Sequence, residues 1–252
     1  MATMPIPEGL PSLLAHYRDK SQAPVRFRPS TWIRTLADVP AAQGVVQVLD
    51  EDRWALADPS GGKPGDRLID RHQLQGAAAE TSLADDRELL SLFLLVQAWG
   101  AGTSGNRTLH HTRTAFGNPD ALLPSLRTTA GTLRGADADI SPLETAYSAW
   151  NSRGVGRSFF TKWFANAGRV DGRPWQPLIL DDRVFATLNK TLDTSTRDMA
   201  GSSNRARRYR AYVEHMHAWA AELATETPTA DVEAERLEWV LFRHNGKPPM
   251  AK

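Results

Sequence analysis

The chain of 252 residues contains no cysteine. This absence excludes disulfide bonds, thiolate zinc sites, iron–sulfur ligation and a cysteine nucleophile, and it fits a reducing compartment. No run approaches the roughly eighteen uninterrupted apolar residues of a transmembrane helix. The start, MATMPIPEGLPSLL, lacks the basic flank and apolar stretch of a signal peptide. We therefore expect a soluble cytoplasmic protein with no membrane partner.

The sequence also lacks a clear excess of either charge, with 30 Lys and Arg against 29 Asp and Glu. The charges are nevertheless unevenly distributed. Residues 150–210 hold twelve Lys and Arg against five Asp and Glu, whereas residues 214–238 hold seven acids against Arg236 alone. A basic face is what contact with a DNA backbone requires. The alternative is a solvated helix face whose basic side chains pair with the acidic C-terminal helices.

Residues 1–80 show little sign of long regular elements, because eight prolines interrupt them. Short helices are plausible near residues 8–18 and from Ser30 or Thr31. The run VVQVL at 45–49 is the best candidate for a strand, and residues 59–65 (PSGGKPG) must form a turn or loop. A small β or irregular portion is therefore expected at the N-terminus.

From residue 83 onward the pattern becomes helical. Asp85 or Asp86 can cap a helix through RELLSLFLLVQAW, which is apolar on nearly all sides and so belongs in the core. A second helix is expected to begin at Asn118-Pro119. Ser141-Pro142-Leu143-Glu144 has the form of a capping box and opens a helix through Trp150. Further helices are expected at residues 157–167, 182–192, 204–225 and 230–243, the last ended by Asn245-Gly246.

These patterns predict a mainly α protein. We expect residues 1–82 to form a mixed segment packed on a helical core of residues 83–252. The two parts would make one compact unit of two subdomains.

A glycine turn lies between two of the predicted helices. Gly154-Val155-Gly156 follows the capped helix and precedes SFFTKWFANAG, so residues 141–168 predict a helix, a hairpin and a second helix. Backbone N–H groups at the start of the second helix can bind phosphate without a specific side chain. Glycine turns of this kind are common, so the turn alone does not identify a function.

Lys162 lies on the second helix at the edge of an aromatic surface made by Phe159, Phe160, Trp163 and Phe164. Partial desolvation there would lower its pKa and leave more free amine for nucleophilic attack. The alternative is a lysine whose stem covers aromatic surface while its ammonium reaches water.

Asp181 follows the apolar run Leu178-Ile179-Leu180 and precedes another predicted helix. This is where a helix N-cap aspartate belongs, and capping alone would explain it. A carboxylate held rigidly at a helix terminus could also stabilise positive charge on a ribose ring. The two roles are compatible.

A polar stretch from Trp99 to Phe116 follows the buried helix, and we expect it to form a loop that either inserts into DNA or lines a base pocket. Trp99 is available for stacking, and Asn106, Arg107 and His110 offer polar contacts. His110 and His111 are adjacent in sequence and so rarely converge on one ion, and no third ligand is evident. We expect no metal site.

The segments GVGRSFFTKWFANAG and PLILDDRV resemble the helix-hairpin-helix DNA glycosylases, in particular their bacterial and archaeal 8-oxoguanine-glycosylase-like branch. In that superfamily a hairpin lysine is followed about twenty residues later by an aspartate in a V/L-D-x-H/N/R-V pattern. Lys162 and Asp181 match this spacing, and Asp182 falls on the variable position. WGAGTSGNR at 99–107 also resembles the group. The hairpin departs from the usual L-P-G-[VI]-G, which puts a hairpin-bound monovalent cation in doubt.

The resemblance implies a mainly α helix-hairpin-helix glycosylase fold and a monomer that binds double-stranded DNA, with no cofactor beyond such a cation. Lys162 and Asp181 are then the catalytic pair. The residues expected to contact the DNA backbone are Arg153, Gly154, Gly156, Arg157, Arg183, Arg207 and Arg208.

The implied reaction is excision of a flipped-out modified base, with a Schiff base at C1′ permitting strand cleavage. Some members of this branch remove hypermodified phage bases such as glucosylated hydroxymethylcytosine in anti-phage defence, and we favour that substrate slightly. Repair of 8-oxoguanine stands beside it. Two other classes also stay open: a non-catalytic DNA-binding module and an interaction protein that binds no nucleic acid.

Overall fold

The computed structural model describes residues 4–103, 105–226 and 232–248, and in these ranges the chain is mainly helical. A three-stranded antiparallel sheet lies near the N-terminus, in the order β1-β3-β2. The strands are β1 (Val25–Phe27), β2 (Ala55–Leu56) and β3 (Arg67–Ile69). The expected mainly α fold with a small N-terminal β portion is therefore confirmed.

The α-helices of the described residues are α1 (Leu10–His16), α2 (Pro29–Leu36), α3 (Arg71–Glu80), α4 (Asp86–Ala101), α5 (Asn106–Phe116), α6 (Pro119–Arg134), α7 (Pro142–Ala149), α8 (Arg157–Ala167), α9 (Asp182–Lys190), α10 (Thr196–Ala200), α11 (Arg205–Glu226) and α12 (Ala234–His244). Asp85 caps α4, α6 begins after Asn118, and Asn245 ends α12 in the left-handed conformation, all as expected. Of the helix expected at 230–243, residues 230 and 231 lie outside the described residues.

The predicted strand at 45–49 is wrong, because Val46–Asp50 forms a 3-10 helix. Val45, Val46, Val48 and Leu49 are buried, whereas Gln47 and Asp50 are exposed. A strand would bury every second residue, but this spacing repeats every three residues. The β-branched composition suggests a strand, and the burial pattern decides for a helical turn. Two further 3-10 helices are Pro40–Ala42 and Pro59–Gly61.

The expected loop between Trp99 and Phe116 is largely helix α5. Its buried residues Thr108, Thr112, Ala115 and Phe116 follow helical spacing. Two of them are threonines, so the apolar stripe is weak in the sequence. The polar composition of α5 therefore conceals its buried face.

The capping box at the start of α7 is also wrong. Ser141 precedes the helix, but its hydroxyl donates to the Asp139 carboxylate and makes no cap. The Glu144 carboxylate accepts a hydrogen bond from Arg210 of α11 at 2.7 Å instead of reaching back to the helix start. Side-chain partners from other parts of the molecule have replaced the local bonds.

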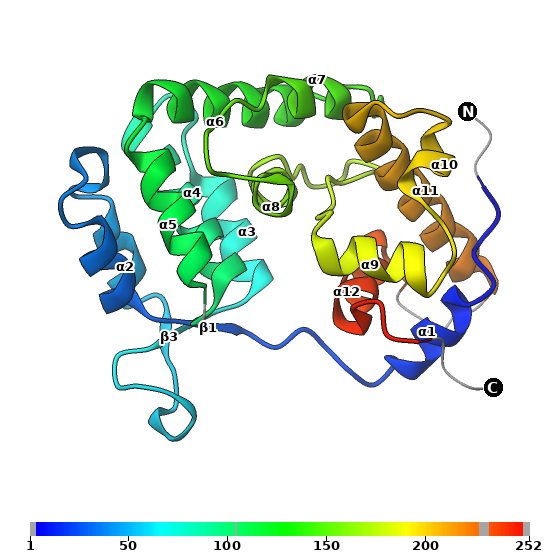
Figure 1. Ribbon diagram of the computed structural model, residues 1–252, viewed down its shortest axis with the longest axis horizontal. Coiled ribbons are helices and arrows are strands. Elements are labelled where there is room, and N and C mark those ends of the chain that lie inside the picture. The colour runs from blue at the N-terminus through cyan, green and yellow to red at the C-terminus, as the bar shows by residue number, and fades with distance from the viewer. Residues whose placement is uncertain (1–3, 104, 227–231, 249–252) are drawn as a thin grey trace.

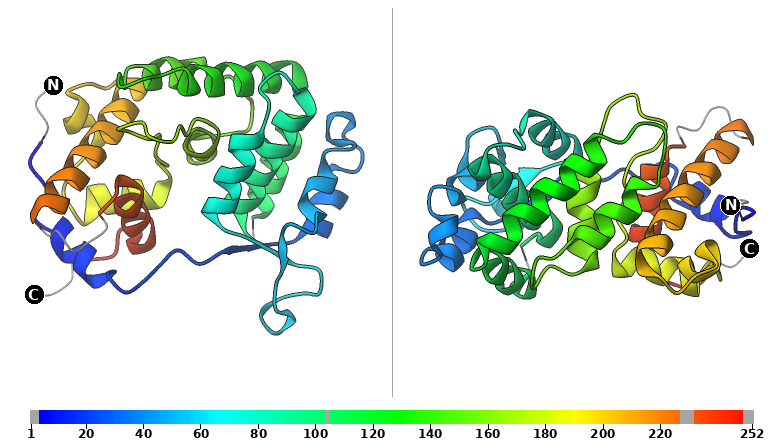
Figure 2. Two further views of the ribbon diagram at one scale, coloured as in Figure 1. Left: turned by 180° about the vertical axis from the view of Figure 1, so that it is seen from behind. Right: turned by 90° about the horizontal axis from the view of Figure 1, so that it is seen from above.

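Helix α8 lies between two groups of helices (Figure 1). On one side it packs against α3, α4 and α6. On the other side, α9 packs against α12, and α11 packs against α7, α10 and α12. The segment between α1 and β1 crosses from one group to the other, and the view from behind shows the same crossing (Figure 2). Because α8 lies between the two groups, the turn before α8 and the start of α9 lie where the groups meet (Figure 1).

Among the residues that the structure describes, no helix has both the length and the apolar character needed to cross a membrane.

Candidate active site

A glycine holds the turn before α8 against α5. Gly154 has φ of +83°, and a Cβ atom at this position would lie 3.0 Å from the backbone oxygen of His111. Only glycine combines this backbone angle with such a close approach. Gly156 is the N-cap residue of α8, and a Cβ atom added there would have no neighbouring atom within 4 Å. The first N–H groups of α8 therefore start at an open surface, where an anion can reach them.

Lys162 is buried on α8, with 6% of its surface exposed. Its Nζ donates a hydrogen bond to the Ser158 backbone oxygen at 2.8 Å and lies 3.4 Å from Asp181 Oδ2. The same nitrogen is 4.9 Å from the centre of the Phe159 ring. The expected edge of an aromatic surface is thus present, but the ammonium points inward and not to bulk water.

Gly100 on α4 makes room for this lysine. A Cβ at Gly100 would lie 2.8 Å from Lys162 Cδ and 3.1 Å from the Phe159 ring. Since α4 and α8 pack side by side in the core, any larger residue at position 100 would displace the lysine stem. This contact gives a physical reason for glycine in the WGAG sequence.

Asp181 divides its two carboxylate oxygens between two tasks. Oδ1 accepts hydrogen bonds from the backbone N–H groups of Arg183 at 2.8 Å and Val184 at 3.1 Å, which caps α9. Oδ2 faces Lys162. Both roles considered for this residue are therefore compatible with one geometry, and the capping bonds fix the position of the oxygen that faces the lysine.

The extended segment before Asp181 is held from several sides. The Thr161 hydroxyl accepts from Leu180 N–H at 3.1 Å, and the hydroxyls of Tyr209 and Tyr212 donate to the Leu178 and Ile179 carbonyls at 2.8 and 3.0 Å. These bonds satisfy backbone groups that would otherwise be buried without partners. Asp181 is consequently presented by a rigid loop.

Opposing effects act on the charge of Lys162. Burial lowers the pKa of the Lys162 ammonium, and the Asp181 carboxylate opposes that shift by charge and hydrogen bonding. Glu238 raises the same pKa from farther away. Desolvation is the largest of these effects. At a given pH, a larger fraction of Lys162 is therefore the free amine than for an exposed lysine.

A cavity of about 70 Å³ opens beside Lys162. Trp99, which we expected to stack on a base, lies in its wall with its indole Nε1 buried and, among the described residues, without a hydrogen-bond partner. The other lining residues come from the crossing segment before β1, from α4, from the Asp181 loop and from the helices on the far side: Gln22, Val25, Gly100, Ile179, Val184, Glu238, Trp239 and Phe242.

Glu238 is the lining residue that sequence reasoning missed. Its carboxylate pairs with Arg71 of α3 at 2.9 Å and accepts from Ile179 N–H at 2.6 Å. Burial raises the pKa of Glu238, and Arg71 opposes the shift. An acid inside the apolar sequence LEWVLF is the available signal, but the charge distribution alone places Glu238 in an acidic surface.

The basic residues expected to contact DNA lie in different surroundings. Arg157 and Arg208 both lie over the ring of Phe185, at 4.7 and 5.7 Å, and so form one cluster beside the hairpin. Arg183 lies over Phe242 at the cavity wall, and Arg153 is exposed on the turn itself. Arg207 is exposed but lies 3.8 Å from Glu144, which also binds Arg210. Arg207 and Arg210 of α11 are therefore paired with an acid, as the alternative expects. That acid, Glu144, is on α7 and not on the C-terminal helices.

The structure separates the expected base-pocket residues. Trp99 lies beside Lys162, but Arg107 lines a different groove, next to the hairpin glycines. Neither Asn106 nor His110 lines the cavity at Lys162. The cause is that α5 continues as a helix and carries these side chains away from the end of α4.

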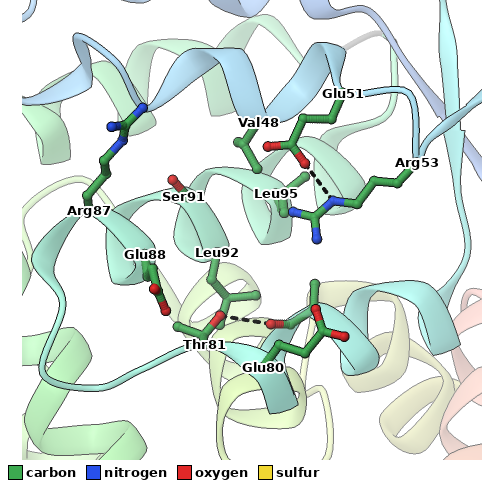
Figure 3. A pocket seen from close by; sticks show the side chains of 11 residues that line it. Val48, Glu51, Arg53, Glu80, Thr81, Arg87, Glu88, Ser91, Leu92 and Leu95 are labelled. Carbon is green, nitrogen blue, oxygen red and sulfur yellow. Dashed lines mark hydrogen bonds and ion pairs between the residues drawn. The ribbon is translucent and has the colours of Figure 1, made fainter.

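Another cavity, of about 320 Å³, lies between η2 (Val46–Asp50), α3 and α4 (Figure 3). Acidic and basic side chains share its wall, and Arg53 pairs there with Glu51 at 2.7 Å. None of the residues predicted to act in catalysis or DNA contact lines it. The candidate active site is therefore the buried pair of Lys162 and Asp181.

A metal ion finds no cluster of ligands in the described ranges, where no three His, Asp or Glu side chains are grouped to hold one. For the monovalent cation implied by the hairpin, Val155 O already accepts from Trp150 Nε1 at 3.3 Å and Gly156 O from Phe159 and Phe160 N–H. Two carbonyls of the turn are thus already engaged in hydrogen bonds within the protein.

Lys162 and Asp181 thus lie together beside a cavity, next to a glycine turn at the start of a helix. Residues 18–242 match the family model described as "Putative 8-oxoguanine DNA glycosylase OGG-like protein". The match covers most of the chain, and the protein belongs to this family. No curated protein and no solved structure matches the chain.

Proposed function

We propose that the protein is a DNA glycosylase in which Lys162 is the nucleophile and Asp181 stabilises the developing positive charge of the sugar. The observation that carries this proposal is the buried contact of 3.4 Å between Lys162 Nζ and Asp181 Oδ2. A structural lysine has no need of a desolvated amine beside a carboxylate that is already fixed by a helix cap.

In the proposed reaction double-stranded DNA binds across the hairpin, and one nucleotide rotates out of the stack towards the cavity. The free amine of Lys162 attacks C1′ of that nucleotide. The N-glycosidic bond breaks, its electron pair leaves with the base, and the base takes up a proton. Asp181 lowers the barrier by placing a negative oxygen beside the sugar as positive charge develops on it.

The amine nitrogen then loses its proton and the sugar ring opens, giving a Schiff base between Lys162 and C1′. Hydrolysis by water releases an abasic site, while loss of a C2′ proton before hydrolysis eliminates the 3′-phosphate and cuts the strand. The proposed enzyme is thus a glycosylase that can also act as an AP lyase.

The family description favours 8-oxoguanine as the excised base. From the amino-acid sequence we favoured a hypermodified phage base and a role in anti-phage defence. The family description does not support either expectation. We therefore propose an oxidised guanine as the substrate.

Incubation with duplexes that contain a normal base, 8-oxoguanine or glucosylated hydroxymethylcytosine, scored for released base and for a borohydride-trapped adduct, tests this function. Release and trapping with 8-oxoguanine DNA are expected. Release from glucosylated DNA alone would replace the substrate but keep the mechanism. DNA binding without release or adduct on any duplex would instead favour a non-catalytic module.

A further inference from the structure

A second groove lies beside the hairpin and shares no lining residue with the cavity at Lys162. It has a volume of about 530 Å³ and runs between the turn before α8 and the side of α5. Its lining residues come from α5, from the hairpin and the first turn of α8, and from the start of α9: Arg107, Thr108, His111, Gly154, Val155, Gly156, Arg157, Ser158, Phe159 and Asp182.

The two walls of this groove have a fixed relation. Gly154 approaches the His111 backbone so closely that a Cβ would lie 3.0 Å from the carbonyl oxygen and 3.4 Å from Thr114 Cβ. Helix α5 is therefore packed against the turn, and its outward side chains move with the hairpin as one surface.

The groove is positive. Two guanidinium groups, those of Arg107 and Arg157, line it together with one carboxylate, that of Asp182, and with the imidazole of His111. The Asp182 carboxylate accepts a hydrogen bond from Arg157 at 2.6 Å. Within the described residues Arg107 pairs with no carboxylate, and its Nε donates to His111 Nε2 at 3.3 Å. A guanidinium bound only to an imidazole keeps most of its donors available to an anion.

We propose that Arg107 and His111 form a second phosphate-binding wall, which holds a phosphodiester of the DNA strand next to the one held by the hairpin N–H groups. This proposal rests on the proposed function, because it assumes that DNA lies across the hairpin. It assigns Arg107 to the DNA backbone, where the sequence suggests a base contact.

DNA binding in this groove should change the protonation of His111. Burial is the main cause that lowers the pKa of His111, and the neighbouring Arg107 and His110 lower it further. Arg157 and Asp182 are the charged groups that face the groove from α8 and α9. A phosphate in the groove draws Arg107 away from Nε2 and favours the imidazolium, so DNA binding takes up a proton. Affinity therefore rises as pH falls through the range in which His111 titrates.

The test compares Arg107→Gln and His111→Gln with His110→Gln by fluorescence anisotropy on a labelled duplex. His110 is an exposed histidine on the same helix that does not line the groove. Because His110 lowers the pKa of His111, His110→Gln controls for the loss of a histidine and should keep the gain in affinity at low pH, shifted to a higher pH range. Each protein is titrated over a range of salt at three pH values, about 5.5, 6.5 and 7.5, which span the usual titration range of histidine. Borohydride trapping on 8-oxoguanine DNA is recorded in parallel at saturating protein.

Arg107→Gln is expected to weaken binding and to lower the slope of log affinity against log salt by about 0.9, the value for one phosphate contact. The wild type and His110→Gln are expected to bind more tightly at low pH, by at most about tenfold per pH unit for one proton, and His111→Gln is expected to lose that gain. Equal affinity, salt slope and pH dependence in all four proteins, with trapping intact, would overturn the second wall and leave the glycosylase standing. Absence of both binding and trapping in the wild type would overturn both proposals.

Discussion

At the scale of single residues, Asp181 is the position where fold and chemistry can be separated. Asp181→Asn keeps an oxygen for the N–H groups of Arg183 and Val184 but removes the negative charge beside Lys162. We expect a folded protein whose single-turnover rate of base excision falls by about 10²-fold or more. Since Asp181 raises the pKa of Lys162, its loss should also shift adduct formation to lower pH.

Asp182→Asn is the matched control for this substitution. Asp182 is exposed and pairs with Arg157 instead of Lys162. Single-turnover excision over a pH series would therefore distinguish the two neighbours. An inactive Asp182→Asn together with a near-normal Asp181→Asn would show that the catalytic carboxylate had been assigned to the wrong residue.

Lys162→Gln removes the amine and keeps most of the stem that packs beside Phe159 and Gly100. We expect a folded protein with near-normal DNA affinity, because the stem is kept and no cavity is created. Its thermal stability should fall, because Asp181 is left as a buried carboxylate without its cation. The borohydride-trapped adduct and strand cleavage should disappear. Lys190→Gln, on an exposed position at the end of α9, should retain both. An undiminished adduct in Lys162→Gln would remove the lysine from the mechanism.

The pairing of Lys162 with Asp181 can be predicted from the sequence, and its surroundings cannot. The spacing of Lys162 and Asp181 matches a family, and the cap at Asp181 follows from ordinary helix rules. Gln22, Glu238 and Phe242 come from distant segments, and their meeting depends on tertiary packing. Arg107 lines a different groove from Lys162 because its segment forms helix α5, which the polar composition of that segment conceals.

At the scale of elements, the hairpin depends on the conformation of one glycine. In Gly154→Ala the new Cβ meets both a φ of +83° and the His111 carbonyl at 3.0 Å. We expect a cost of about 1–3 kcal/mol in unfolding free energy and weaker DNA binding, because the turn must move away from α5. Chemical denaturation and anisotropy measure the two effects.

Gly156→Ala is the comparison on the same turn. Gly156 has a negative φ of −77° and no neighbour within 4 Å of a Cβ position. Its substitution should therefore leave the unfolding free energy nearly unchanged. If Gly154→Ala were equally harmless, the packing of the hairpin on α5 would not control the position of the turn.

Elements with a strong apolar period are predictable, and those held by other contacts are not. The Asp85 cap of α4 and the start of α6 at Pro119 follow from local sequence. The segment at 45–49 forms a 3-10 helix because burial selects a spacing of three. The capping box at Ser141 does not form because Asp139 and Arg210 offer its side chains better partners. In each failure other contacts outweigh the local preference.

At the scale of the whole molecule, the segment before β1 and the C-terminal helix α12 meet around the candidate active site. The segment before β1 and helix α12 both line the cavity, and α1 packs on α12. The buried bridge from Arg71 to Glu238 joins α3 to α12 across this junction and also holds Ile179, two residues before Asp181. The same carboxylate thus connects α3, α12 and the segment that precedes Asp181.

Breaking this bridge from one side should be more harmful than removing it from both. In Arg71→Met, Glu238 is left as a buried acid without its cation, and we expect a loss of about 3–5 kcal/mol in unfolding free energy. The double variant Arg71→Met/Glu238→Gln keeps an oxygen for Ile179 N–H and removes the charge, so much of the stability should return. Chemical denaturation of the single and double variants measures the recovery.

The pH dependence of Arg71→Met adds an independent check. Burial raises the pKa of Glu238 and Arg71 opposes this, so the pKa in the single variant is higher still. A folded-state pKa above the unfolded value means that the folded protein binds more protons in the interval between them, and stability falls as pH rises through it. Denaturation at about pH 5 and about pH 8 should therefore show a larger loss at the higher pH for Arg71→Met than for the double variant. An equal loss in both would mean that Glu238 is not the group left uncompensated, and the bridge would then contribute packing and not charge balance.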